Sequence, residues 1–176
     1  MALELNGTTG VSLVQDGVVT AADLAAGAIT SSALPEGSVL QVVSEYFEPT
    51  SQSAYTTTTF TDTGISATIT PTSTSSKILC IGDLGMILYS ASAPILCFAR
   101  GTSVINDGAF SAGQYGHYLY NQGASTYGPV HMTFLDTPNT TSATEYSVYI
   151  RGQTTASAIT VHAGSANSIT LIEIAG

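Results

Sequence analysis

The sequence has little charge, and most of that charge is of one sign. Only 9% of its 176 residues are charged, and three cationic side chains face twelve acidic ones, for a formal net charge of −9. Globular proteins carry about 25% charged residues on average. Nucleic-acid backbones and anionic membrane surfaces are bound by clustered lysine and arginine. The composition therefore argues against nucleic acid and membrane surfaces as partners.

The chain also lacks segments that would place it across a membrane or in an oxidising compartment. Its longest apolar run, between Lys77 and Tyr89, is interrupted by Asp83 and is shorter than the roughly 20 residues that a bilayer requires. The N-terminus has no basic residue and no hydrophobic stretch, so no signal peptide is predicted. Cys80 and Cys97 lie in strand-like apolar runs, which favours two buried free thiols over a disulfide.

What the sequence does contain is apolar surface, at 44% of its residues. A chain with so few charges must cover its surface with serine and threonine hydroxyls or bury part of it against copies of itself. We expect both, and therefore a homo-oligomer.

A short repeat occupies the N-terminal region. Glycines recur every ten positions at Gly17, Gly27 and Gly37. Apolar residues recur in the same register, namely Val19, Leu24, Ile29 and Leu34. A ten-residue unit cannot enclose a core within one chain, so it must stack on neighbouring copies. A slender three-chain stem of extended segments and single helical turns is preferred, and a flexible Ala/Gly linker is the alternative.

The remainder of the chain reads as a succession of short strands. Apolar and β-branched residues alternate, most clearly in 144–150, and turn residues separate the runs. The predicted strands are 39–43, 55–60, 65–69, 78–89, 95–100, 102–105, 117–120, 130–135, 146–151, 159–162 and 169–174, with turns at 106–108, 137–139, 151–152 and 163–164. An all-β fold follows, most simply a jelly-roll sandwich. The apolar last strand is expected to be central to its sheet.

No catalytic or cofactor motif is present, and neither an enzyme nor a metal or cofactor is expected. The sequence has no nucleophile elbow, phosphate loop or His-Glu-x-x-His motif. His117, His131 and His162 are far apart, so exposed strand histidines are preferred over an axial metal shared by three chains. Paired glycosidase carboxylates would have to come from Asp62, Asp83, Asp107, Asp136 and Glu145. Of these, Asp107 and Asp136 are expected to cap turns.

Two further groups of residues are candidates for interactions. Five of the nine tyrosines lie between Gln114 and Gly128, and aromatic faces beside amides suit a neutral recognition surface. The receptor-binding hypothesis names Tyr115, His117, Tyr118, Tyr120 and Tyr127, with tyrosines lining the sandwich or a trimer axis as the alternative. Arg100 and Arg151 are expected to pair across a subunit interface with Asp83, Asp107 or Glu145.

Several of these segments resemble tail-fibre and virion structural proteins of marine and cyanobacterial tailed phages. The opening Leu5-Asn-Gly-Thr-Thr-Gly-Val11 and Leu34-Pro-Glu-Gly-Ser-Val-Leu-Gln-Val42 look like their N-terminal parts. Phe98-Ala-Arg-Gly-Thr102, 134–143 and Ser168-Ile-Thr-Leu-Ile-Glu-Ile174 are similar to their C-terminal domains. The resemblance implies a homotrimer whose head is like the tumour-necrosis-factor and C1q jelly rolls.

The resemblance and the composition lead to one expectation for the whole chain. Residues 1–15 attach to other virion proteins, residues 16–36 form the trimeric stem, and residues 37–176 form the jelly-roll head. The protein is expected to be a short trimeric tail fibre or spike, assembled in the host cytoplasm and located on the virion. Its head would bind a host-surface glycan or protein. The alternative is a capsid decoration or head-fibre protein.

Overall fold

The computed structural model describes residues 33–89, 93–106, 109–110, 114–115, 117–118, 126–155, 159–161 and 164–176. The chain divides into two units between Leu34 and Pro35, and nearly all the described residues belong to the second unit, Pro35–Gly176. The predicted stem residues Val19, Leu24 and Ile29 lie outside the described residues. Leu34 is described, and it is exposed.

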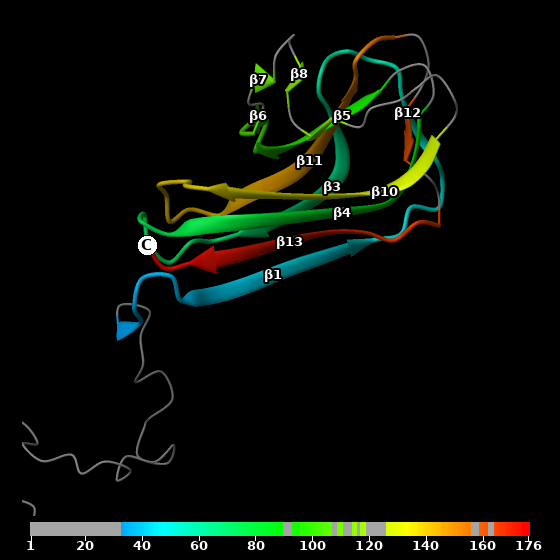
Figure 1. Cartoon of the computed structure of the whole chain (residues 1–176). Coiled ribbons are helices and arrows are strands. Elements are labelled where there is room, and N and C mark those ends of the chain that lie inside the picture. The colour runs from blue at the N-terminus through cyan, green and yellow to red at the C-terminus, as the bar shows by residue number, and fades with distance from the viewer. Residues whose placement is uncertain are drawn as a thin grey trace, which may run out of the picture. The chain divides into compact units, whose positions relative to one another are not determined.

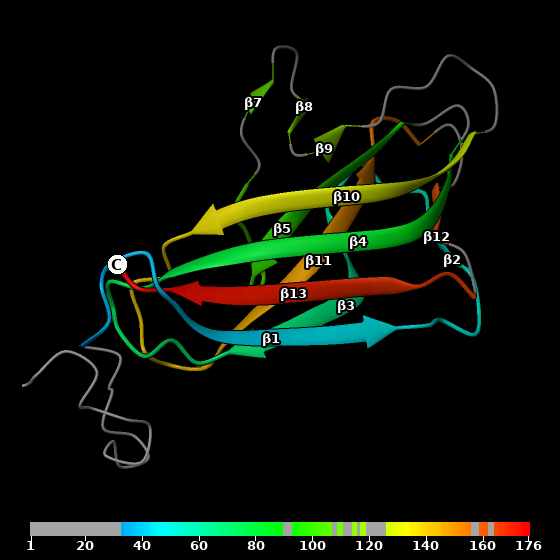
Figure 2. The same ribbon diagram turned by 60° about the horizontal axis from the view of Figure 1, so that its bottom comes forward.

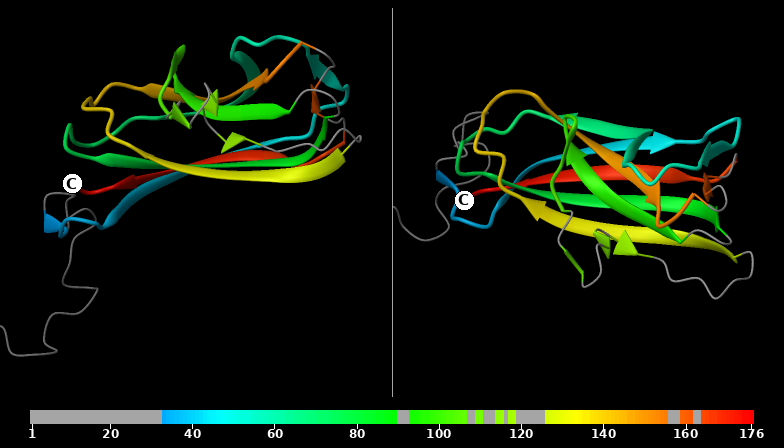
Figure 3. Two further views of the ribbon diagram at one scale, coloured as in Figure 1. Left: turned by 45° about the horizontal axis from the view of Figure 1, so that its top comes forward. Right: turned by 90° about the horizontal axis from the view of Figure 1, so that it is seen from above.

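The head is built from two antiparallel sheets, each four strands wide when short strands that share an edge are counted once, which face each other as a β-sandwich (Figures 1 and 3). The first sheet has the order β1-β13-β4-β10, with the short strands β12 and β2 pairing beside the far end of β4 (Figure 2). Its strands are β1 (Val39–Phe47), β2 (Ser53–Tyr55), β4 (Lys77–Tyr89), β10 (Thr126–Asp136), β12 (Ile159–Val161) and β13 (Asn167–Ile174). As predicted, the last strand is interior to its sheet, between β1 and β4.

The second sheet has the order β3-β11-β5, and two short strands share the outer edge of β5. Its strands are β3 (Thr61–Ile69), β5 (Pro94–Arg100), β6 (Ser103–Val104), β9 (His117–Tyr118) and β11 (Thr144–Gly152). A separate pair is formed by β7 (Ala109–Phe110) and β8 (Gln114–Tyr115). The expected all-β fold is thus confirmed.

Side-chain alternation places the core between the sheets. In β11, the alternation seen in 144–150 places Tyr146, Val148 and Ile150 on the inward face, where they are fully buried. They meet Ile78, Leu84, Ile169 and Leu171 of the first sheet in one hydrophobic cluster. Burial of such side chains contributes roughly 1.5–3 kcal/mol each, so this interleaved layer is the main source of stability for the head.

Two sequence predictions of local structure were wrong. The run 55–60 was predicted to be a strand because of its threonines, but β2 ends at Tyr55. The Thr57 hydroxyl instead accepts a hydrogen bond from the Thr59 amide, and such local side-chain bonds compete with a ladder. Arg151 and Gly152 were predicted to turn, but they continue β11 opposite Ile95 and Pro94.

Candidate functional site

The described residues of the predicted receptor-binding group lie on three strands, β8, β9 and β10. The backbone of Tyr115 lies in β8, and that of His117 and Tyr118 in β9, at the edge of the second sheet. Tyr127 lies in β10 of the first sheet, opposite Leu88, and its side chain is exposed. Tyr120 and His162 lie outside the described residues. The receptor hypothesis for this group stays a prediction.

Arg100 does not need a neighbouring subunit for its partner, contrary to expectation. Its guanidinium donates a 2.9 Å hydrogen bond to Asp136 Oδ2 within the same chain. The buried Tyr146 hydroxyl donates to the same oxygen at 2.7 Å. Burial, together with the Asp136 carboxylate, raises the pKa of Tyr146. Asp136 is therefore a buried structural carboxylate and not the turn cap that its sequence context predicted, because the end of β10 turns its side chain inward.

Arg151 lies against an aromatic ring of the same chain. Its guanidinium carbon lies 5.0 Å from the centre of the Phe60 ring, within the range of a cation–π contact. Phe60 follows the threonine run that fails to form a strand, so this contact helps to hold that irregular segment against β11.

A second buried carboxylate, Glu173 in β13, lies in the first sheet with its side chain pointing inward. Its Oε1 accepts hydrogen bonds from the Thr72 amide, the Thr72 hydroxyl and the Ser76 hydroxyl at 2.7, 2.8 and 2.6 Å. Its Oε2 accepts one from the side-chain NH2 group of Gln41 at 2.6 Å. Burial would raise the pKa of Glu173, but these hydrogen bonds outweigh burial and hold the pKa below its ordinary value.

The outward face of the first sheet carries a pattern that sequence analysis missed. The register places Val42, Ile172, Leu79 and Leu135 in one row across all four strands. The next outward positions along these two strands, Val39 and Ile174, are also apolar and lie opposite each other. Among the described residues, five of the six exposed large hydrophobic side chains belong to this face, namely Val39, Val42, Tyr46, Tyr127 and Leu135. We call the surface formed by these outward-pointing side chains the outer face of the first sheet.

Two polar rows cross the same outer face. In one, the Ser44 and Thr170 hydroxyls bond each other at 2.8 Å, beside Ile81 and Thr133. In the next, the His131 ring bonds the Asp83 carboxylate, and the Ser168 hydroxyl donates to the other Asp83 oxygen at 3.4 Å. His131 is thus an exposed strand residue, as preferred from the sequence. The outer face therefore has an apolar end at the row of Val42 and Leu135 and a polar end at the row of Asp83 and His131.

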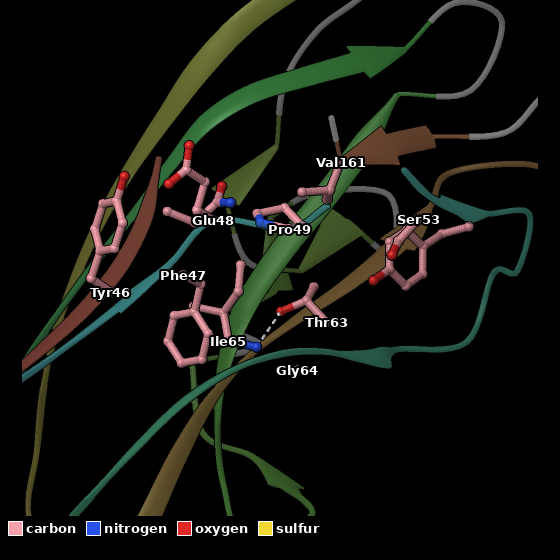
Figure 4. A pocket seen from close by; sticks show the side chains of 11 residues that line it. Tyr46, Phe47, Glu48, Pro49, Ser53, Thr63, Gly64, Ile65 and Val161 are labelled. Carbon is pink, nitrogen blue, oxygen red and sulfur yellow. Dashed lines mark hydrogen bonds between the residues drawn. The ribbon is translucent and has the colours of Figure 1, made fainter. Parts of the chain in front are cut away.

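A pocket of about 360 Å³ lies beside the end of β1 (Figure 4). Its apolar lining comes from Phe47, Pro49, Ile65 and Val161, and its remaining lining from Tyr46, Glu48, Ser53, Tyr55, Thr63, Gly64 and Asn167. Burial raises the pKa of Tyr55. The nearby Asp62 adds to this rise, and the hydrogen bond with Ser53 opposes it without cancelling it. None of the three cationic side chains of the chain lines this pocket.

Other kinds of site find no support in the described part of the chain. Cys80 and Cys97 are buried and are not joined in a disulfide, as predicted, and burial raises the pKa of the Cys80 thiol. Within the described ranges, no three His, Cys, Asp or Glu side chains are placed to hold a metal ion. No helix among these residues has the length and apolarity to span a bilayer.

Comparisons with known proteins do not assign the chain to a family. No protein-family model matches it, and no curated protein matches its sequence.

Proposed function

We propose that this protein is a homotrimeric structural protein of a bacteriophage virion, a short fibre or spike whose β head recognises the host surface. The observation that carries the proposal is the apolar row on the outer face of the first sheet. A large apolar patch on a soluble domain is typical of an interaction surface. With only 9% charged residues, the chain has few side chains with which to keep that face in water as a monomer.

The strand pairing supports a jelly roll as the finer description of the head. A jelly roll is a long eight-stranded hairpin wrapped into two sheets, so that the first strand pairs with the eighth, the second with the seventh, and so on inward. With the short strands β2, β6, β7, β8 and β12 left out and the two-residue β9 kept, the observed pairs are β1 with β13, β3 with β11, β4 with β10, and β5 with β9. All four strand pairs expected of a jelly roll are present, and this supports the jelly-roll head that the sequence resemblance implies.

Both the apolar end and the polar end of the outer face are suited to being covered by a second copy of the chain. At the apolar end, Val42 and Leu135 occupy the two edge strands, so a neighbouring copy would bury side chains from every strand of the sheet. At the polar end, Asp83, His131 and Ser168 satisfy one another within a single chain. A second copy can therefore cover this end with the Asp83 carboxylate already hydrogen-bonded, which lowers the cost of burying it.

A trimer of this kind would act by multivalent display. Residues 1–15 would attach the protein to a virion partner, and residues 16–36 would form its stem. Three heads on each trimer, and several trimers on each particle, would turn weak single contacts into firm attachment. A neutral or anionic trimer surface is consistent with recognition of a glycan or protein and not of a nucleic acid.

The first test is the oligomeric state of the purified protein, measured by light scattering after gel filtration. The expected result is a trimer for the natural sequence and a monomer for Leu135→Asp, which places a charge at the β10 end of the apolar row. Thr141→Asp adds the same charge to an exposed loop and should remain trimeric. A monomeric natural protein, or a trimer unaffected by Leu135→Asp, would contradict the proposed interface.

The second test locates the protein on purified particles by gold-labelled antibody. Labelling of the tail would support a role in host recognition. Labelling of the shell would instead favour the capsid decoration or head-fibre alternative, and absence from the particle would refute a virion protein of either kind.

A further inference from the structure

The pocket beside the end of β1 is separate from the tyrosines named by the sequence. Tyr46 and Glu48 stand on one side of the hollow and Ser53 on the other, with Phe47 and Ile65 between them (Figure 4). The volume of about 360 Å³ is at the small end of the roughly 300–1,000 Å³ typical of small-molecule sites. A pocket of this size accommodates a single ring and its substituents.

Most polar groups of the lining are already engaged within the protein, and this makes the wall rigid. The Thr63 hydroxyl donates to the Val148 carbonyl at 2.7 Å and accepts from the Ile65 amide. The Asn167 side chain accepts from the Gly85 amide and donates to the Ser165 carbonyl. Glu48 lies beyond the last residue of β1 and is exposed. Its carboxylate is a group of the lining that can accept hydrogen bonds from a ligand.

The charge of the pocket lining limits the chemical classes of ligand that the pocket can bind. Glu48 is the one charged side chain in it, and no cationic side chain lies there to bind a phosphate, a sulfate or an acidic sugar. The aromatic rings of Tyr46, Phe47 and Tyr55 offer faces on which an apolar surface can pack. The combination of aromatic faces with a hydrogen-bond-accepting carboxylate fits a neutral ring that has C–H groups on one face and hydroxyl groups around its edge.

We propose that this pocket binds a neutral saccharide, one sugar unit of a host-surface glycan. The C–H face of the sugar packs against the aromatic side chains, and its hydroxyl groups donate hydrogen bonds to the Glu48 carboxylate. This inference rests on the proposed role of the head in host recognition. It moves the recognition site from the tyrosine-rich segment to the opposite edge of the first sheet, where β1 ends.

The test uses the full-length protein and a panel of simple sugars in saturation-transfer NMR and titration calorimetry. The panel contains methyl α-glucoside, methyl β-galactoside, methyl α-mannoside and N-acetylglucosamine, with sialic acid and choline as an anionic and a cationic ligand. The expected result is binding of at least one neutral sugar with a dissociation constant on the order of 1 mM, and no binding of sialic acid. Binding of choline alone, or of no neutral sugar, would overturn the proposal.

Matched variants assign any binding to the pocket. Glu48→Gln and Tyr46→Ala should each weaken sugar binding by about tenfold or more, because a hydrogen bond to a charged group and an aromatic face are lost. Glu45→Gln and Tyr149→Ala change side chains that do not line the pocket, and they should bind within about twofold of the natural protein. Equal binding by all four variants would overturn the assignment. Because Tyr46 also belongs to the outer face, each variant is compared at the same oligomeric state.

Staining of host cells with the labelled protein separates this inference from the proposed function. If the natural protein stains host cells and Glu48→Gln stains them equally, host recognition stands and the saccharide pocket is refuted. If the natural protein binds a sugar but stains no host cell, the pocket stands and the proposed role in host recognition is refuted.

Discussion

Replacing Glu173 with glutamine tests how the last strand is held in the sandwich. Glutamine keeps the shape of the side chain and can still accept the three hydrogen bonds that reach Oε1 from Thr72 and Ser76. It then directs an NH2 group at the Gln41 amide, where two donors would face each other. The Gln41 side chain also donates to the Thr70 carbonyl at 2.7 Å, so turning its amide to relieve the conflict would break that bond.

The expected destabilisation follows from these contacts. A hydrogen bond to a charged group contributes about 1.5–3 kcal/mol. Glu173→Gln removes one such bond and weakens three others by taking away the charge. We expect the free energy of unfolding to fall by about 2–4 kcal/mol at pH 7, which is a large part of the stability of an ordinary domain. Glu45→Gln, at an exposed position of β1, should change stability by less than about 0.5 kcal/mol.

The same variant gives a signed pH dependence. The pKa of Glu173 is lowered in the folded protein, so the ionised carboxylate contributes its full stability above the unfolded pKa. That contribution is lost as the pH falls through the folded pKa. The gap between the natural protein and Glu173→Gln should therefore be widest at pH 7 and shrink at pH 3.5. Urea unfolding at fixed protein concentration measures both values, and an equal gap at the two pH values would refute the role given to the charge.

Three further predictions test other parts of the head. Gly85→Ala should destabilise by about 2 kcal/mol or more in urea unfolding, because its Cβ would overlap the backbone of Ala166. Gly82→Ala meets only the Met132 and Phe98 side chains, at 3.2 Å, and should cost clearly less; equal effects would contradict this account. Asp136→Asn should lower stability by about 2–4 kcal/mol because it leaves Arg100 and the Tyr146 hydroxyl without their shared charged acceptor, and a neutral effect would show that the pair is not structural. Cys80 and Cys97 should not react with a thiol reagent at pH 8 until the protein is unfolded, since both are fully buried; rapid labelling of the native protein would argue against that burial.

The strands could be predicted from the sequence because alternation is a local signal. The inward face of β11 is visible in the alternation of residues 144–150, and the central position of β13 follows from its apolar character. The buried carboxylates could not be predicted in this way. The side-chain partners of Glu173 are 97, 101 and 132 residues away in the sequence. Asp136 looked like a turn cap because its neighbours are turn residues, while its actual partner Arg100 is 36 residues distant.

The outer face did leave a signal in the sequence, although alternation alone does not reveal it. Along β13 the inward positions run from Asn167 through apolar residues to the charged Glu173, while the outward positions run from Ser168 to Ile172 and Ile174. The polarity of the two faces is therefore exchanged along one strand. A charged residue can occupy the inward position because four hydrogen bonds neutralise the cost of burying it. Nothing within the described chain covers the outward isoleucines in the same way, and the neighbouring Val42 and Leu135 remain exposed. The pattern agrees with the proposal that another copy of the same chain buries this outer face.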